Sequence, residues 1–385
     1  MNPREDCPGC GSTELTEEFR IPRQPVVLNY RFKDASSAGG VLRRDVTLRQ
    51  CRKCGLVFNA TFDGRLIPYD QNYENRQHHS PVFTEHLSAL ARHLSQETGL
   101  KGGRILEVGC GKGDFLRLLC EEAGATGDGY DTSYEPGESP ESEQVRFYPQ
   151  YVAASDITAP YAAVICRHVV EHVPEIGPFL LELAAISRAA GDPVVVIETP
   201  RFEWIVQNLC LWDVFYEHCN YFPTQTLAYL CQRAGFRVVQ QRAVFGSQYQ
   251  LLELRVEQCA SALEACGIPA GAELATFGAA ARSALVEWVT KIDAAREGKS
   301  WALWGAGAKG VAFVNQFAGS SPQCIVDVNP AKQGGVLPGS AIPIVAPANL
   351  PIHELGLILI ANPNYAPEIR AVLRQLGYVG ATLTL

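Results

Sequence analysis

The stretch that decides the fold is Arg104-Ile105-Leu106-Glu107-Val108-Gly109-Cys110-Gly111-Lys112-Gly113-Asp114. Apolar residues end in Glu-x-Gly-x-Gly and run into a helix-like segment, which is typical of a buried strand, a tight turn and a helix. Glycine lets backbone amides approach a ligand where a side chain would clash. Because a tight turn of this kind occurs in any doubly wound α/β fold, the glycines alone are only weak support for a nucleotide site.

Apolar strand candidates alternate with helix-like stretches on both sides of this turn. The candidates are Arg104–Val108, Ala125–Tyr130, Ala162–Cys166, Pro193–Glu198 and Phe236–Gln240. Such alternation predicts a parallel sheet with helices on both faces. The second candidate strand runs into Asp131, where such folds place an acid that binds ribose hydroxyls.

The turn reads Glu-x-Gly-Cys-Gly and not Gly-x-Gly-x-x-Gly, and together with Asp131 it resembles the class I S-adenosylmethionine-dependent methyltransferases. The stretch Val164–Pro174 also looks like the family's segment at the fourth strand. The resemblance implies a Rossmann-like donor domain that binds S-adenosylmethionine, with Asp131 at the ribose. The other donor-binding residues that it implies are Glu107, Gly109, Cys110, Gly111, Arg167 and His168.

Two Cys-x-x-Cys pairs precede this domain, one formed by Cys7 and Cys10 and the other by Cys51 and Cys54. Four thiolates complete a tetrahedral zinc site and leave no position for water, so the spacing predicts a structural zinc ion. The alternatives are two unrelated turns or a redox dithiol. We expect residues 11–50 to fold as a small sheet held by the metal, because a module of this size is marginal without one.

Composition excludes several classes of protein. The chain is 47% hydrophobic with a formal net charge of −8, which argues against a general nucleic-acid binder because such proteins need clustered Lys and Arg. No apolar stretch reaches the length of a membrane span, and the first residues lack the apolar core of a signal peptide. Most of the 13 cysteines stand singly inside apolar runs. We therefore expect a cytoplasmic protein in a reducing compartment.

A cluster of ionisable and aromatic residues, Trp212–Phe222, follows the strand candidate Pro193–Glu198. Doubly wound sheets place ligands at such carboxyl ends, although a solvated surface helix would give a similar pattern. With the cysteine module and the terminal domain, the Glu-His-x-x-Tyr-Phe run resembles nucleotide-sugar C-methyltransferases of deoxysugar biosynthesis, and the same three-part order covers nearly the whole chain. This resemblance implies that His218 removes a proton from the carbon next to a 4-keto group. An imidazole titrates near neutrality, as such a base requires.

The same resemblance implies roles for the neighbours of His218. Glu217 is expected to orient the imidazole, and His172 or a tyrosine such as Tyr216 to stabilise the enolate oxygen. Tyr73 is expected to cover the donor. One departure bears on the substrate: where the sugar enzymes have Tyr two residues before the Glu, this chain has Phe215, with Tyr216 one place later. A different keto sugar or an oxygen or nitrogen acceptor therefore stays open.

A second glycine turn, Gly305-Ala306-Gly307-Ala308-Lys309, follows the strand candidate Trp301–Trp304. The next strand, Cys324–Val326, ends in Asp327, a pattern that fits a dinucleotide-binding fingerprint. The resemblance implies another use, in which Gly305, Gly307 and the helix start receive the diphosphate of a nucleotide sugar. Lys309 would add a charge there, Asp327 would bind hydroxyls, and Asn362, after the strand candidate Leu357–Ile360, would touch the nucleotide.

These observations divide the chain into a zinc-binding module at residues 1–80, a methyltransferase domain at residues 81–257 and a Rossmann-like substrate-binding domain at residues 258–385. Ser261–Glu297 is Ala-rich with helical spacing and begins the last part. Because three domains can form a complete site, we expect a monomer with a small-molecule substrate. The alternatives are an O-methyltransferase, a nicotinamide-dependent oxidoreductase or a binding scaffold with a degenerate donor pocket.

Overall fold

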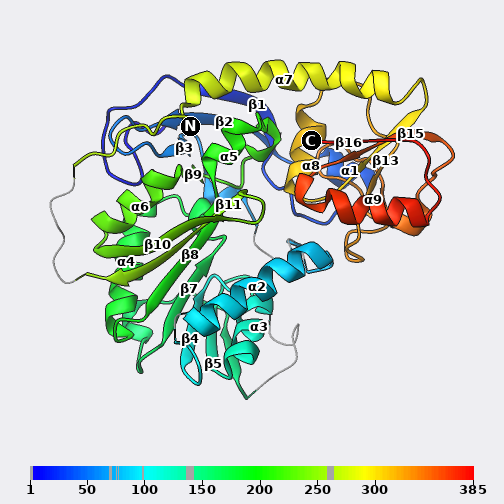
Figure 1. Ribbon diagram of the computed structural model, residues 1–385. Helices are drawn as coiled ribbons and strands as arrows, with labels where there is room; N and C mark the ends of the chain where they lie inside the picture. The colour runs from blue at the N-terminus through cyan, green and yellow to red at the C-terminus, as the bar shows by residue number, and fades with distance from the viewer. Residues whose placement is uncertain are drawn as a thin grey trace.

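The computed structural model describes residues 3–68, 72–74, 76, 78–97, 99–135, 143–257 and 264–385. Figure 1 shows the N-terminal residues at the top left, the green central sheet below them and the orange to red C-terminal part at the right. The long helix α7 (Leu274–Ala295) runs along the top from the N-terminal residues to the C-terminal part. None of the helices described is both long and apolar enough for a membrane span.

The central sheet has the order β10-β11-β8-β7-β4-β5-β6. Strands β4 to β8 are parallel, as predicted, but β11 is antiparallel to both of its neighbours. The prediction of a wholly parallel sheet is therefore wrong at this edge, where a turn at residues 245–248 folds β11 back on β10. The strands are β4 (Arg104–Val108), β5 (Thr126–Tyr130), β6 (Val145–Tyr148), β7 (Ala163–Arg167), β8 (Val194–Pro200), β10 (Phe236–Val244) and β11 (Tyr249–Val256).

Helices cover both faces of this sheet, as predicted. Along β7, Ala163 and Ile165 pack with α2 (Pro81–Glu97) and α3 (Asp114–Ala123). The alternate residues Val164 and Cys166 pack with α4 (Ile176–Ala189) and α6 (Thr224–Arg233). Successive strand side chains point to opposite faces, so a run of buried residues supplies two cores. The shorter helices are α5 (Phe202–Gln207) and the 3-10 turns η2 (Ala154–Asp156), η3 (Val170–His172) and η4 (Leu211–Asp213).

The N-terminal cysteine module contains an antiparallel sheet of order β1-β2-β3-β9. Its last strand, β9 (Asn220–Tyr221), comes from the Trp212–Phe222 run and not from the module. The module and the candidate active-site run therefore share one sheet. The remaining elements are β1 (Phe19–Pro25), α1 (Ala35–Gly39), β2 (Arg43–Gln50), β3 (Val57–Asn59) and η1 (Gly64–Leu66).

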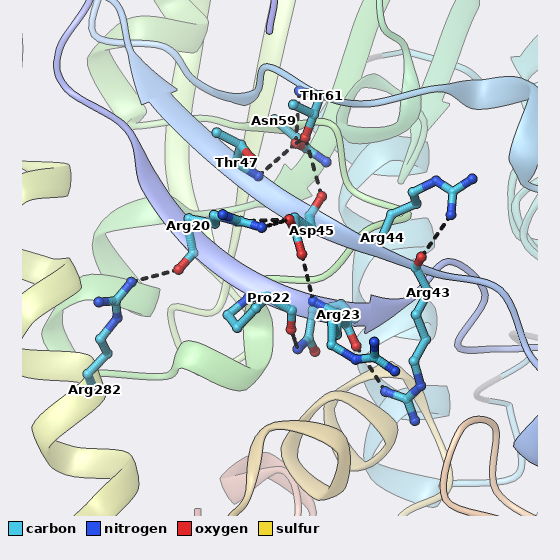
Figure 2. A network of polar contacts seen from close by, with 11 residues as sticks. Arg20, Pro22, Arg23, Arg43, Arg44, Asp45, Thr47, Asn59, Thr61 and Arg282 are labelled. Carbon is cyan, nitrogen blue, oxygen red and sulfur yellow. Dashed lines mark hydrogen bonds and ion pairs between the residues drawn. The ribbon is translucent and has the colours of Figure 1, made fainter. Parts of the chain in front are cut away.

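Figure 2 shows how this sheet is joined to α7. A bulge in β1 between Ile21 and Gln24 directs the amide of Arg23 to the Asp45 carboxylate at 2.9 Å, and the Arg20 guanidinium also pairs with Asp45. On the other side, Arg282 of α7 donates to the carbonyl oxygen of Arg20 at 2.6 Å. The polar network therefore attaches the middle of α7 to β1.

The C-terminal sheet is parallel, with the order β14-β13-β12-β15-β16. The predicted Ala-rich helix is α7, which begins at Leu274; residues 258–263, next to the expected domain boundary, lie outside the described part of the chain. The other elements are β12 (Ser300–Trp304), α8 (Ala308–Gln316), β13 (Cys324–Val326), β14 (Ile344–Val345), η5 (Pro347–Asn349), β15 (Leu355–Ile360), η6 (Pro363–Tyr365), α9 (Ala366–Gln375) and β16 (Ala381–Thr384).

Candidate active site

The four predicted zinc ligands lie together. The Sγ atoms of Cys7 and Cys54 are 3.6 Å apart, as are those of Cys10 and Cys51, and all four lie within 4.8 Å of one another. Zinc–sulfur bonds of about 2.3 Å in a tetrahedron place sulfur atoms roughly 3.8 Å apart. The four thiols therefore fit a closed zinc site, in which the ion would crosslink the two Cys-x-x-Cys turns.

The cysteine module reaches the candidate active-site run directly. The strand β3, which begins three residues after Cys54, pairs with β9, and the amide of Asn59 donates to the carbonyl oxygen of Cys219 at 2.9 Å. Cys219 follows His218 in the chain. The backbone position of His218 therefore depends on the module.

The donor turn has the close approach expected of its glycines. Gly109 adopts a φ of 72°, and a Cβ atom there would lie 2.3 Å from Cγ2 of Val169. The amide of Gly111 donates to Oδ2 of Asp131 at 2.8 Å, so the acid that ends the second strand is in contact with the turn. Oδ1 of Asp131 accepts from the amide and hydroxyl of Ser133. Cys110 is buried between these residues, and burial raises the pKa of its thiol.

Two ionisable side chains beside the turn carry polar atoms without partners. Oε2 of Glu107 and Nη2 of Arg167 are buried and make no hydrogen bond. Burial raises the pKa of Glu107 to about 8, against the favourable charge of Arg167. Arg167 also donates to Glu198 at 2.6 Å and stacks on Phe115, with Cζ 4.2 Å from the ring centroid. Unpaired buried polar atoms are rare in folded proteins, so this pair fits a polar ligand such as the amino-acid end of S-adenosylmethionine.

His168 is the other predicted donor residue in this stretch. It adopts a φ of 53°, which is uncommon for a residue with a side chain. Its Nδ1 lies 3.3 Å from Glu171, and its Nε2 is 3.9 Å from Glu198 and makes no hydrogen bond. The imidazole therefore lies between two buried carboxylates.

His218 and His172 face each other across the candidate catalytic site. Their ring centroids are 4.8 Å apart with the rings nearly perpendicular, and Phe215 covers His218 with its ring centroid 4.2 Å away. Nδ1 of His172 donates to the carbonyl oxygen of Glu217 at 2.9 Å. Burial lowers the pKa of His218 well below its usual value. The imidazole is therefore neutral at physiological pH and competent to accept a proton.

The side chains of Glu217 and Tyr216 point elsewhere than the sequence predicted. The fully buried Glu217 carboxylate accepts hydrogen bonds from the Leu28 amide and, at 3.0 Å, from the Tyr73 hydroxyl, and it makes no hydrogen bond to His218. The Tyr216 hydroxyl accepts from the Asp63 amide at 2.9 Å, inside the module. A turn at residues 215–218 explains the difference: the His218 amide donates to the carbonyl oxygen of Phe215 at 3.3 Å, so these two residues come together while Tyr216 and Glu217, at the corner of the turn, point elsewhere.

The second glycine turn is built as predicted, but several of its polar groups bond within the protein. Gly305 has a φ of 118°, and Gly307 precedes the first turn of α8. Oδ2 of Asp327 accepts from the Ala306 amide at 2.7 Å, and Oδ1 accepts from the Asn329 amide at 2.8 Å. The carboxylate thus supports the turn itself.

Lys309 and Asn362 also have partners within the protein. The Lys309 ammonium pairs with the Asp213 carboxylate and lies 4.5 Å from the centroid of the Trp204 ring. It therefore joins α8 to α5 and η4 of the methyltransferase part. Oδ1 of Asn362 accepts from the Asn364 amide at 3.0 Å and caps η6.

Sequence reasoning missed two groups near the site. Glu171 lies within the Val164–Pro174 stretch but received no role, although it is buried beside His168 and accepts from Thr199 at 2.9 Å. Glu74 follows Tyr73 and pairs with Arg76, while Asn329 of the C-terminal part donates to it at 3.3 Å. Of these two groups, only Glu171 could have been found from the sequence, because it stands between His168 and His172.

Comparison with known proteins agrees with this geometry. The methyltransferase domain family matches residues 77–241, and the C-methyltransferase C-terminal domain family matches residues 236–384. The chain is 26% identical over 395 residues to C-methyltransferase NovU of Streptomyces niveus, a match that covers 96% of this chain and 92% of that protein.

Partial structural likenesses include 1,6-didemethyltoxoflavin-N1-methyltransferase of Burkholderia thailandensis and magnesium protoporphyrin IX methyltransferase of Synechocystis PCC 6803, both with bound S-adenosylhomocysteine. Each is 17% identical to this chain, and each match covers 46% of it. The first match covers 82% of the other chain with a TM-score of 0.36, and the second covers 84% with a TM-score of 0.35. With scores this low, the assignment rests on the family matches and the strand order. The two matches together span residues 77–384, and with the donor turn they identify the chain as a class I S-adenosylmethionine-dependent methyltransferase that carries a C-methyltransferase C-terminal domain.

Proposed function

We propose that this enzyme methylates the carbon next to the ketone of a nucleotide-linked 4-keto sugar, with His218 as the base. The observation that carries the proposal is the imidazole of His218, which lies beside His172 and Phe215 and whose pKa is lowered well below its usual value by burial. A neutral imidazole at this position is suited to removing a weakly acidic C–H proton.

The site lies beside the donor turn. Strand β7, which leads to His172 through η3, pairs with β4, which leads to the donor turn. Val169, three residues before His172, is the residue that a side chain at position 109 would strike. A substrate held against His218 and His172 therefore lies next to the donor pocket.

The proposed chemistry follows from these positions. S-adenosylmethionine, when bound, supplies an electrophilic methyl group. His218 takes the proton from the carbon next to the ketone, and the electrons of the C–H bond form the enolate. His172 in its protonated form donates from Nε2 to the enolate oxygen, while its Nδ1 donates to the carbonyl oxygen of Glu217. The enolate carbon bonds to the methyl group as the bond from that methyl to sulfur breaks, and the proton on His218 leaves to solvent.

We assign the nucleotide to the turn before α8, whose helix start is suited to a diphosphate. Lys332 donates from Nζ to the carbonyl oxygen of Ala306 in that turn at 3.1 Å, whereas the Lys309 ammonium is held by Asp213. The substrate class rests on the resemblance to nucleotide-sugar C-methyltransferases. We further propose a structural zinc ion, a monomer and a cytoplasmic location.

Methylation of a hydroxyl group is the second candidate, and Phe215 is the observation that favours it. Phe215 packs on His218 and brings no hydroxyl to the site where the sugar enzymes have one. Without that hydroxyl group, His172 is the residue left to stabilise an enolate oxygen. A hydroxyl acceptor would need only the base and no enolate stabilisation.

The test is proton exchange in deuterated water with a panel of nucleotide-linked 4-keto sugars, followed by mass spectrometry with S-adenosylhomocysteine present to prevent methylation. We expect deuterium at the carbon next to the ketone with the wild type and none with His218→Ala. The control is His353→Ala, which changes an exposed histidine before β15. Hydroxyl methylation of the same sugars without exchange would favour the second candidate.

A further inference from the structure

Glu171 places a buried carboxylate beside both imidazoles of the candidate catalytic site. It is 2% exposed, and its carboxylate oxygen and one ring nitrogen each of His172 and His218 all lie within 4.8 Å of one another. It reaches this position because η3 turns the chain immediately after β7. Glu217, the carboxylate next to His218 in the sequence, faces Tyr73 instead.

The surroundings of Glu171 hold it in the ionised form. Burial alone raises the pKa of the carboxyl group, but the hydrogen bond with His168 and the charges of His168, His172 and His218 outweigh it and hold the pKa at about 2. Thr199 adds a hydrogen bond from its hydroxyl to Oε2 at 2.9 Å. The site thus contains a fixed negative charge.

We propose that Glu171 is the positioning residue that stabilises the positive charge formed on His218 when it accepts the substrate proton. The inference rests on the proposed function. A neutral imidazole that gains a proton in a partly buried site becomes an imidazolium with little solvent to stabilise it. A carboxylate within about 4–6 Å compensates that charge through space and makes the imidazole a stronger base. Glu171, and not Glu217 as the sequence predicted, is therefore the carboxylate that acts on the His218 imidazole.

Other charged and titratable groups around His218 set the background for this effect. The His172 and His168 imidazoles and the Lys309 ammonium oppose protonation of His218, whereas Glu171 favours it. Cys166 and Cys219 flank Glu171, and burial raises the pKa of both thiols, so they stay neutral. The structure therefore assigns the compensating negative charge to Glu171 among the groups that act on His218.

The test is the pH profile of the solvent-exchange reaction in Glu171→Gln. The neutral imidazole is the active form, so the exchange rate rises with pH through the pKa of His218. Glu171 raises that pKa, so its neutralisation is expected to move the acidic limb of the profile to lower pH by about 1–3 units. The maximal rate should fall roughly tenfold or more, because general-base catalysis contributes about 100- to 10,000-fold. A residue that only supports the fold would lower the rate without moving the limb.

The matched control is Glu217→Gln, which neutralises the neighbouring carboxylate that faces away from His218. The exchange rate of Glu217→Gln is expected to fall, because Tyr73 is displaced. The acidic limb of its pH profile should stay at the wild-type position. Donor affinity by calorimetry verifies that each variant is folded. If Glu171→Gln does not fold, Glu171→Asp provides the test. This variant keeps the negative charge, so the acidic limb of its pH profile should remain near the wild-type position. A limb shifted to lower pH would overturn the proposal.

The outcomes separate this inference from the proposed function. If the wild type exchanges no proton with any keto sugar, the proposed function fails and the inference fails with it. If the wild type exchanges and Glu171→Gln keeps the wild-type limb, only the inference is overturned. The inference is also overturned if the acidic limb shifts in Glu217→Gln and stays in place in Glu171→Gln, because the charge acting on His218 would then be that of Glu217.

Discussion

Replacing Glu217 with alanine should release the module from the active-site run. The carboxylate accepts from the Leu28 amide and the Tyr73 hydroxyl in a fully buried position. Hydrogen bonds to a charged group contribute about 1.5–3 kcal/mol each, and alanine leaves both donors without a partner. The expected loss of local stability is therefore about 3–6 kcal/mol. Glutamine keeps one acceptor oxygen, so its cost should be about 1–3 kcal/mol.

Hydrogen exchange of the Leu28 amide measures this loss locally, which matters because a chain with three sheets need not unfold in a single transition. A loss of about 3 kcal/mol corresponds to exchange roughly 100-fold faster. The control is Glu121→Ala, which changes an exposed residue of α3 and should leave the Leu28 amide protected. Unchanged protection in Glu217→Ala would refute the assignment of this carboxylate to the module.

Four further outcomes follow from the described contacts. Removal of zinc by a chelator, or Cys51→Ser, should lower the midpoint of thermal unfolding, and metal analysis should find one zinc per wild-type chain. Gly109→Ala should weaken S-adenosylmethionine binding at least about tenfold in calorimetry, because its Cβ meets Val169, whereas Gly102→Ala, with a φ of 68° and open space, should not. Lys309→Met should destabilise the protein by about 1–3 kcal/mol and change the KM for a nucleotide sugar less than tenfold; a larger rise in KM would show that Lys309 contacts the diphosphate. Burial raises the pKa of Glu107 to about 8, so its carboxyl group binds a proton more tightly in the folded state than in the unfolded state. This group therefore contributes its whole stabilisation below pH 4.5 and loses it as the pH rises through 8. Glu107→Gln should abolish the dependence of unfolding free energy on pH that this group causes.

The sequence was sufficient for the parts of the fold that depend on local pattern. Each strand candidate in the donor domain begins within one residue of an observed strand, because buried parallel strands are continuous apolar runs. The reversed strand β11 was missed because its direction depends on the turn at residues 245–248 and on its pairing with β8. Strand direction is a property of tertiary pairing and has no signature in the composition of a single strand.

In the candidate site, too, features set by local sequence pattern were predictable and those set by tertiary contacts were not. Residue types and spacing predicted the four-cysteine cluster, and they placed Asp131 at the end of the second strand, where the structure has it in contact with the donor turn. Side-chain direction was not predictable: adjacency to His218 favoured Glu217 as its partner, yet the turn at residues 215–218 directs Glu217 toward Tyr73, and the carboxylate beside His218 is Glu171 of η3. The pairing of β3 with β9 was also hidden, because it joins segments far apart in the chain.

The most direct test of the account is to locate the methyl group in the product formed with S-adenosylmethionine labelled with carbon-13 on its methyl group. Nuclear magnetic resonance of the purified product distinguishes a methyl group on carbon from one on oxygen. The account predicts a carbon-bound methyl group next to the former ketone, with no product from His218→Ala and normal product from His353→Ala. An oxygen-bound methyl group, or a carbon-bound one formed at the wild-type rate by His218→Ala, would contradict it.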